Sequence, residues 1–155
     1  MEKKNYIQHL REKVGHEPVI LVFAGGILTN DRDEILLQKR SDFNLWGLPG
    51  GALEFGEDAV AACKREFMEE TGINIEVDKL LGVSTNNIQN YPNGDVAQSV
   101  VIDFLVSSIG KEVTTLSSET LNLQYFSKNN LPKIFNQQHQ TAINNYYSKK
   151  YPYFE

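Results

Sequence analysis

Residues 51–73 read GALEFGEDAVAACKREFMEETGI, and the end of this stretch carries three closely spaced glutamates. Glu66, Glu69 and Glu70 follow one another at helical spacings, so on a helix they share an arc of about 100° and an axial length of about 6 Å. Like charges this close repel one another and oppose helix formation. Because carboxylate oxygens are the ligands that hard divalent ions prefer, we expect this acidic face to bind such a cation.

The residues around the glutamates predict a helix with defined ends. Asp58 is a typical N-cap, and Gly72 stands where a left-handed C-terminal residue is common. These signals predict a helix of about 13 residues over 59–71. The alanines beside the glutamates are expected to leave room for a ligand. A helical wheel places three residues on the side that faces the core: Val60, Cys63 and Phe67.

The residues before this helix predict one short helix and two strands. Apolar side chains at helical spacing indicate an amphipathic helix over about residues 4–14. Two β-rich runs follow, 19–28 and 34–38, and the turn-forming residues between them predict an antiparallel hairpin. Pro49 and the glycines after it then break regular structure and permit a ligand to approach the backbone closely.

The remainder of the chain continues the alternation of strands and helices. Residues 73–83, 96–107 and 121–126 have strand-like composition, and helical periodicity returns from Leu131. No internal repeat or low-complexity linker interrupts the pattern. We therefore predict one α/β domain over residues 1–155.

The composition of the chain limits the kinds of molecule that it is expected to bind. The 155 residues carry a net charge of −5, which argues against a stable nucleic-acid complex through a broad basic surface and favours a small substrate. Cys63 is the lone cysteine and is expected to be a buried thiol. No secretory segment or membrane-length apolar run is evident, so we expect a cytoplasmic protein without membrane contact. The N-terminal helix and the aromatic tail 151–154 could mediate a homodimer or cap the core.

The spacing of the fixed residues in 51–73 resembles the Nudix box, GX5EX7REUXEEXGU, in which U is aliphatic or bulky and apolar. A chance match at every defined position has a probability below about one in a million per window. The chain is therefore identified as similar to the MutT-like Nudix hydrolase superfamily. The residues that carry the match are Gly51, Glu57, Arg65, Glu66, Phe67, Glu69, Glu70, Gly72 and Ile73.

This resemblance implies a fold and an activity. The fold is an α/β/α sandwich with a mixed parallel and antiparallel sheet. The activity is hydrolysis, dependent on Mg²⁺ or Mn²⁺, of the pyrophosphate bond in a nucleoside diphosphate linked to another moiety. Nucleoside triphosphates, ADP-ribose and nucleotide sugars all remain open as substrates. The alternative is a Nudix-fold regulatory module that binds a nucleotide without turnover, although such modules usually lack box glutamates that this chain retains.

The resemblance also implies metal ligands and a general base. The metal ligands are the side chains of Glu66, Glu69 and Glu70 together with the backbone carbonyl of Gly50. Two glutamates are candidates for the base that takes a proton from water. One is Glu69 itself, and the other is Glu119, which stands in the loop before the strand over 121–126.

Other residues of the motif and its surroundings have supporting roles by the same resemblance. Gly51 and Gly72 permit tight turns at the two ends of the box. Glu57 and Arg65 form a pair in which the arginine holds the helix glutamates in place. Arg40, at the end of the strand before the loop, is expected to contact a substrate phosphate because its forked donors suit that role.

The aromatic and histidine residues give weaker signals. Trp46 is expected to pack beneath the Pro-Gly-Gly loop rather than stack on a nucleobase, and Tyr91 is the more exposed candidate for stacking. His9, His16 and His139 are scattered without a nucleophile or metal-ligand pattern, so all three are expected at the surface.

Overall fold

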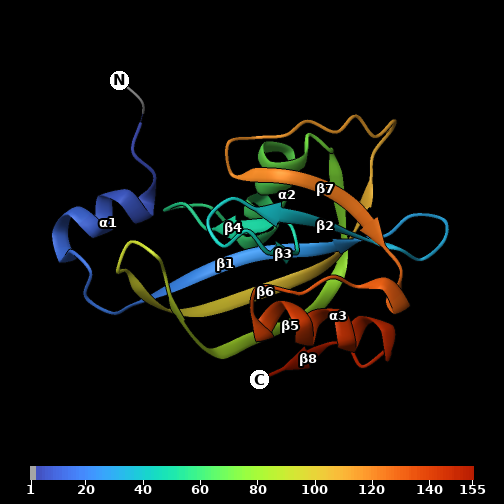
Figure 1. Ribbon diagram of the computed structural model, residues 1–155. Coiled ribbons are helices and arrows are strands. Elements are labelled where there is room, and N and C mark those ends of the chain that lie inside the picture. The colour runs from blue at the N-terminus through green and yellow to red at the C-terminus, as the bar shows by residue number, and fades with distance from the viewer. Residues whose placement is uncertain (1–2) are drawn as a thin grey trace.

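The computed structural model describes residues 3–155, so the first two residues of the predicted domain lie outside the described part (Figure 1). Its helices are α1 (Tyr6–Val14), α2 (Ala59–Thr71), the 3-10 helix η1 (Lys128–Asn130) and α3 (Gln137–Tyr147). The strands of the larger sheet are, in spatial order, β4 (Gly50–Ala52), β1 (Val19–Leu28), β6 (Val96–Ser108), β5 (Ile75–Asn90) and β8 (Tyr153–Phe154). Those of the smaller sheet are β3 (Trp46–Gly47), β2 (Ile35–Arg40) and β7 (Thr120–Phe126).

The larger sheet is mixed, as predicted. Strands β1 and β6 run parallel in register from Val19 opposite Ala97 to Leu28 opposite Val106. The pairs β1–β4 and β5–β6 are antiparallel, and the short β8 is parallel to β5. All pairs of the smaller sheet are antiparallel. Together with the helices, this confirms the predicted mixed α/β fold.

The predicted hairpin between residues 19–28 and 34–38 is wrong. Both segments are strands, but they share a single bridge between Thr29 and Ile35 before they enter different sheets. Strand β1 pairs instead with β4, which precedes α2, and with the distant β6. The two sheets separate beyond the bridge, and a cavity, here named the main cavity, lies in the space between them.

Helices cover both faces of these sheets. This is seen along β2, where successive side chains point alternately toward α2 and toward α3. Leu36 packs in the cluster beneath α2, whereas Ile35 and Leu37 pack in a second cluster beneath α3. Phe67 is fully buried in the first cluster, and a buried side chain of this kind stabilises a fold by about 1.5–3 kcal/mol. The α/β/α layering predicted from the motif is therefore present.

Helix α2 has the predicted ends but not the predicted faces. The Asp58 side chain accepts a hydrogen bond from the backbone N–H of Ala61 at 2.8 Å, and Gly72 is left-handed with φ of 76°. Cys63 is buried as predicted. Val60, however, is 41% exposed, and Ala62 is fully buried in the core, so the alanine leaves no room for a ligand. The buried arc of α2 is thus rotated toward Ala62, away from the first turn's valine.

The two ends of the described chain pack differently. The C-terminal tail forms β8, and Tyr153 covers Gly82, where a Cβ would lie 2.4 Å from the tyrosine ring. Phe154 is 92% exposed. Helix α1 has no buried residue, and the guanidinium of its Arg11 donates to the carbonyl of Val96 at 2.9 Å. Among residues 3–155, none of the helices combines the length and apolarity that a membrane span requires.

Candidate active site

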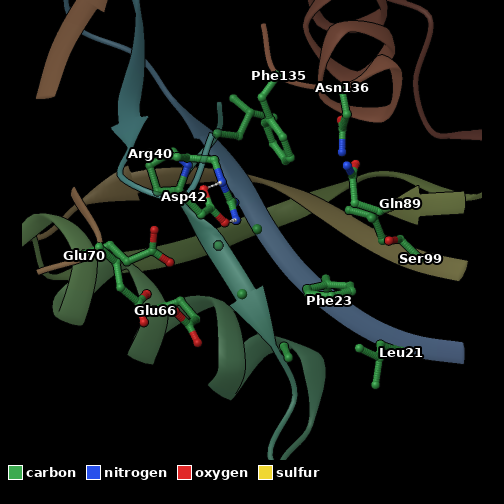
Figure 2. A pocket seen from close by; sticks show the side chains of 18 of the residues that line it. Leu21, Phe23, Arg40, Asp42, Glu66, Glu70, Gln89, Ser99, Phe135 and Asn136 are labelled. Atoms are coloured by element: carbon green, nitrogen blue, oxygen red, sulfur yellow. Dashed lines mark hydrogen bonds and ion pairs between the residues drawn. The ribbon is translucent and has the colours of Figure 1, made fainter. Parts of the chain in front are cut away.

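A cavity of about 470 Å³ lies between the two sheets (Figure 2). Its lining comes from α1, β1, β2, β4 and the segment that leads into it, α2, β5, β6 and the start of α3. One end carries the carboxylates of Glu66 and Glu70, and the opposite end carries the amides of Gln89 and Asn136 (Figure 2). Apolar side chains also line the cavity: Leu21, Phe23 and Phe135. It is therefore acidic at one end and polar at the other, and its lining also includes Arg11 and Asp95, which form an ion pair at 3.5 Å.

Glu70 is a buried carboxylate at the acidic end, with 4% of its surface exposed. The side-chain amide of Gln38 donates to it, and the amide oxygen of Gln38 accepts from the Thr120 hydroxyl at 2.8 Å. Burial raises the pKa of Glu70 well above its usual value, and the neighbouring carboxylate of Glu66 raises it further. Two carboxylates this close favour either a shared proton or a bound cation.

Glu66 lies directly against the strand that leads into α2. A Cβ on Gly51 would stand 2.4 to 2.6 Å from the three atoms of the Glu66 carboxyl group. A Cβ on Gly50 would lie 2.6 Å from the carbonyl oxygen of Ala24 on β1. Glycine at both positions therefore lets this backbone fit between β1 and the carboxylate of the helix.

Arg65 connects the glutamates of this region. Its guanidinium donates to both carboxylate oxygens of Glu57 at 2.8 and 2.9 Å, and to the carbonyl of Ala52 at 3.0 Å. It also donates to Glu66 at 2.8 Å and to Glu69 at 3.2 Å. These hydrogen bonds hold the pKa of Glu57 below its ordinary value. The geometry fits the expected role of Arg65 in orienting the helix carboxylates.

The donor set fits a hard divalent ion by chemical type. Glu66, Glu70 and the backbone of Gly50 line the same cavity, and carboxylate and carbonyl oxygens are the ligands that Mg²⁺ and Mn²⁺ prefer. The Glu66 carboxyl group lies against Gly51, the residue after Gly50, so two of these candidate ligands are close together. Glu69 is exposed and lines a neighbouring hollow rather than this cavity, so the structure does not bring it to the same point as Glu66 and Glu70. Within residues 3–155, no three acidic, histidine or cysteine side chains are already gathered around one point.

Glu119 lies on the same side of the cavity as the box glutamates. It lines the cavity together with Glu66, and its backbone carbonyl accepts from the N–H of Ser41 at 3.0 Å. Partial burial raises the pKa of Glu119, and the nearby charge of Glu66 adds to this effect. The structure thus brings together two residues that stand far apart in the sequence.

Arg40 also reaches the cavity, but its charge is already paired. Its guanidinium donates to Asp42 through two hydrogen bonds of 3.0 and 2.7 Å, and it lies 4.3 Å from the centre of the Phe135 ring. A phosphate at this position would have to compete with the Asp42 carboxylate for the same donors.

These features can be compared with known proteins. The sequence model of the NUDIX domain matches residues 21–146, which is most of the chain. This chain belongs to the Nudix family. A putative 8-oxo-dGTP diphosphatase from Bacillus subtilis is 33% identical over 120 residues, which cover 77% of this chain and 75% of that protein. An ADP-ribose pyrophosphatase from Methanocaldococcus jannaschii is 33% identical over 115 residues, which cover 73% of this chain and 65% of that protein.

Solved structures of Nudix proteins share the fold. A NUDIX hydrolase from Nitrosomonas europaea superposes with a TM-score of 0.71 at 22% identity, covering 90% of this chain and 78% of that one. A MutT NUDIX hydrolase from Burkholderia pseudomallei superposes with a TM-score of 0.68 at 29% identity, covering 83% of this chain and 97% of that one.

In this Nudix chain the floor of the cavity carries polar residues that the sequence analysis missed. Asp103 on β6 is 2% exposed, and burial raises its pKa to about 7. The Tyr153 hydroxyl donates a hydrogen bond to its carboxylate at 3.5 Å. Gln138 of α3 donates to the carbonyl of Ser99 at 2.9 Å, while its own amide oxygen has no partner in the described chain. Asp103 is the one acidic residue in the strand-like run 96–107, and this was the signal in the sequence that could have marked it as a site residue.

The predictions for Trp46 and His139 have different outcomes. Trp46 packs edge-on against Phe126, with 4.8 Å between ring centres, which fits packing rather than stacking on a base. Tyr91 lines the cavity and is partly buried. His139 is also partly buried, contrary to prediction, because its Nδ1 accepts from the backbone N–H of Leu48 at 2.9 Å. Burial lowers the pKa of His139 to about 3, so it is neutral.

Proposed function

We propose that this chain is a hydrolase that depends on Mg²⁺ or Mn²⁺ and cleaves the pyrophosphate bond of a nucleoside diphosphate derivative. The observation that carries the proposal is the pairing of Glu66 with the buried Glu70 at one end of a cavity of nucleotide size. Support comes from relatives named as an 8-oxo-dGTP diphosphatase and an ADP-ribose pyrophosphatase. Phosphoanhydride substrates are common to both names.

The residues that would hold the metal ion are Glu66, Glu69, Glu70 and the carbonyl of Gly50. When bound, such an ion neutralises phosphate charge and lowers the pKa of a bound water. Arg65 contributes by fixing the carboxylate of Glu66 through its hydrogen bond of 2.8 Å. Burial of Glu70 excludes water from one side of the site.

Two glutamates can take the proton from the attacking water. Glu119 is the first choice, because its side chain lines the cavity beside Glu66 and no ion pair to a cation is seen for it among the described residues. Glu69 is the second choice, because Arg65 already holds its carboxylate at 3.2 Å. A base must accept a proton during the reaction, and a guanidinium at hydrogen-bond distance opposes that step.

The nucleoside part of the substrate would occupy the main cavity. Phe23 and Phe135 offer apolar surfaces to a flat base, and Gln89 and Asn136 offer amide groups to its edge (Figure 2). Arg40 would then steady a phosphate between the base and the acidic end, in competition with Asp42. This orientation places the reacting phosphates beside Glu66 and Glu70.

The direct test is to incubate the purified chain with Mg²⁺ and a panel of nucleoside triphosphates, ADP-ribose and nucleotide sugars. Release of a nucleoside monophosphate or pyrophosphate from at least one compound is expected, and it should disappear in Glu70→Gln. Glu76→Gln is the matched control, because Glu76 is exposed on β5 away from the cavity. A wild-type chain that cleaves none of the compounds with either Mg²⁺ or Mn²⁺ overturns the proposal, and binding without turnover would favour the regulatory module.

A further inference from the structure

A second hollow adjoins the main cavity at its acidic end. The two share four lining residues, which are Asn5, Glu54, Glu66 and Glu119. The rest of the lining of the second hollow comes from the N-terminal segment and from the Nudix box: Lys3, Lys4, Tyr6, His9, Phe55, Arg65 and Glu69. The box glutamates thus stand between a cavity suited to a nucleoside and a hollow of mixed charge. Lys3, Lys4 and Arg65 are its basic residues, and its carboxylates are Glu54, Glu66, Glu69 and Glu119.

The N-terminal segment is fixed in this position by hydrogen bonds. The backbone N–H of Tyr6 donates to the Glu54 carboxylate at 2.9 Å, so the first turn of α1 is attached to the loop that precedes α2. Asn5 and Gln8 form a reciprocal capping box that defines where α1 begins. The other end of α1 is held by Arg11, which donates to Val96. Lys3 and Lys4 are therefore placed beside the box glutamates by a docked helix.

The arginines near the site already have partners, which distinguishes them from these lysines. Arg65 is held by Glu57, Glu66 and Glu69, and Arg40 is held by Asp42. Lys4 does pair with Glu12, but this pair lies on the exposed surface of α1, where such pairs contribute little and exchange readily. Lys3 is also exposed. Both lysines can therefore turn toward an anion in the second hollow.

We propose that Lys3 and Lys4 bind the terminal phosphate of a nucleoside triphosphate and so favour triphosphates over nucleoside diphosphate sugars. This inference rests on the proposed function, because it takes the nucleoside to lie in the main cavity with its phosphates crossing beside Glu66 and Glu70. A third phosphate then extends into the second hollow, where it adds negative charge beside the two ammonium groups. The distal ribose of ADP-ribose would enter the same hollow without that charge, so the lysines discriminate between the two.

The test compares Lys3→Gln/Lys4→Gln with wild type on dGTP and on ADP-ribose, both with Mg²⁺. We expect kcat/KM for dGTP to fall about five- to tenfold, mainly through KM, and kcat/KM for ADP-ribose to change less than about twofold. Salt should weaken wild-type selectivity for dGTP, because exposed charges are screened. Lys149→Gln/Lys150→Gln is the matched control, since these adjacent lysines are exposed beyond α3.

Several results would overturn the inference. The inference is wrong if the variant loses the same activity on both substrates, or if it loses none on dGTP. It is also wrong if wild type cleaves ADP-ribose but not dGTP. Each of these results leaves the proposed function intact. If wild type cleaves neither compound, the remaining compounds of the panel decide the proposed function. Calorimetric binding of an α,β-methylene triphosphate analogue then decides the inference: a fall in affinity confined to Lys3→Gln/Lys4→Gln supports it, and unchanged affinity overturns it.

Discussion

Gln38 on β2 donates a hydrogen bond from its side-chain amide to the buried carboxylate of Glu70 on α2. Gln38 is itself 1% exposed, and its amide oxygen accepts from the hydroxyl of Thr120 on β7. A residue of the smaller sheet therefore orients the Glu70 carboxylate on α2. Acidic residues of the box depend on a residue outside the box for their geometry.

Replacement of Gln38 by Leu should weaken metal binding. The variant keeps the volume of the side chain but leaves Glu70 without its donor and Thr120 without its acceptor. We expect affinity for Mg²⁺ to fall about 10- to 100-fold, as is usual when a group that orients a metal ligand is lost. The free energy of unfolding should fall by about 1–3 kcal/mol. Calorimetric Mg²⁺ titration without nucleotide and urea denaturation measure the two effects.

Gln98→Leu serves as the control for Gln38→Leu, because Gln98 is exposed on β6 and its amide bonds to the carbonyl of Thr85. It should leave the affinity for Mg²⁺ unchanged. An unaltered Mg²⁺ titration in Gln38→Leu would show that this hydrogen bond does not matter for the metal.

Gly51→Ala should displace Glu66 from the cavity. The added methyl group would stand 2.4 to 2.6 Å from the Glu66 carboxyl atoms, so either the side chain or β4 must move. We expect turnover of the best substrate to fall at least about 100-fold, because an error of about 1 Å in a site of this kind costs that much. Steady-state kinetics measures the loss.

Gly110→Ala is the comparison for Gly51→Ala. Gly110 has φ of 72° and open space around it, so alanine there strains the backbone without touching the site. Its turnover should match wild type even though its stability falls by about 1 kcal/mol. Comparable turnover in both alanine variants would contradict the tight contact between Gly51 and Glu66.

Asp103 should make stability depend on pH. Burial raises its pKa from an ordinary 3.8 to about 7, so between these values the folded chain binds one more proton than the unfolded chain at this residue. The contribution of Asp103 to the free energy of unfolding is therefore complete below about pH 4 and is lost as the pH rises to 7. One unit of pKa corresponds to about 1.4 kcal/mol, so the loss is on the order of 4 kcal/mol.

Asp103→Asn tests this, because asparagine does not ionise. Urea denaturation in EDTA should show that the variant gains stability relative to wild type as the pH rises from 4 to 8. Asp31→Asn, at an exposed turn before β2, is the matched control for the loss of an acidic side chain. A constant difference between wild type and Asp103→Asn across this range would mean that the carboxyl group does not titrate as the structure indicates.

Local signals in the sequence were sufficient for α2 and the motif. An N-cap, a left-handed glycine and the glutamate spacing are all read from neighbouring residues, and Asp58 and Gly72 have the predicted roles. The buried side of α2 was harder to predict from the sequence, because it depends on which face of the sheet the helix packs against. Val60 is exposed and Ala62 is buried for this reason.

Pairing between distant segments could not be predicted in the same way. Turn-forming residues between 19–28 and 34–38 indicated a hairpin, but β4 and β6 occupy the edges of β1. This arrangement places Asp103 beside Gly25, and α3 then brings Gln138 over the same cavity. Neither residue belongs to a motif: the parallel register of β1 with β6 brings Asp103 to the site, and the packing of α3 brings Gln138.

Glu119→Gln should lower turnover without a large change in substrate binding. The side chain lines the cavity next to Glu66, and glutamine keeps its shape while it removes the ability to accept a proton. General-base catalysis contributes about 10²- to 10⁴-fold, so we expect kcat to fall by at least 100-fold while KM changes only a few-fold.

Partial burial and the charge of Glu66 raise the pKa of Glu119, so wild-type kcat should decline at acid pH as this carboxylate becomes protonated. That acid limb should vanish in Glu119→Gln. If instead Glu119→Gln keeps both wild-type kcat and the acid limb, while Glu69→Gln loses them, the base is Glu69, and Arg65 must release its carboxylate during the reaction.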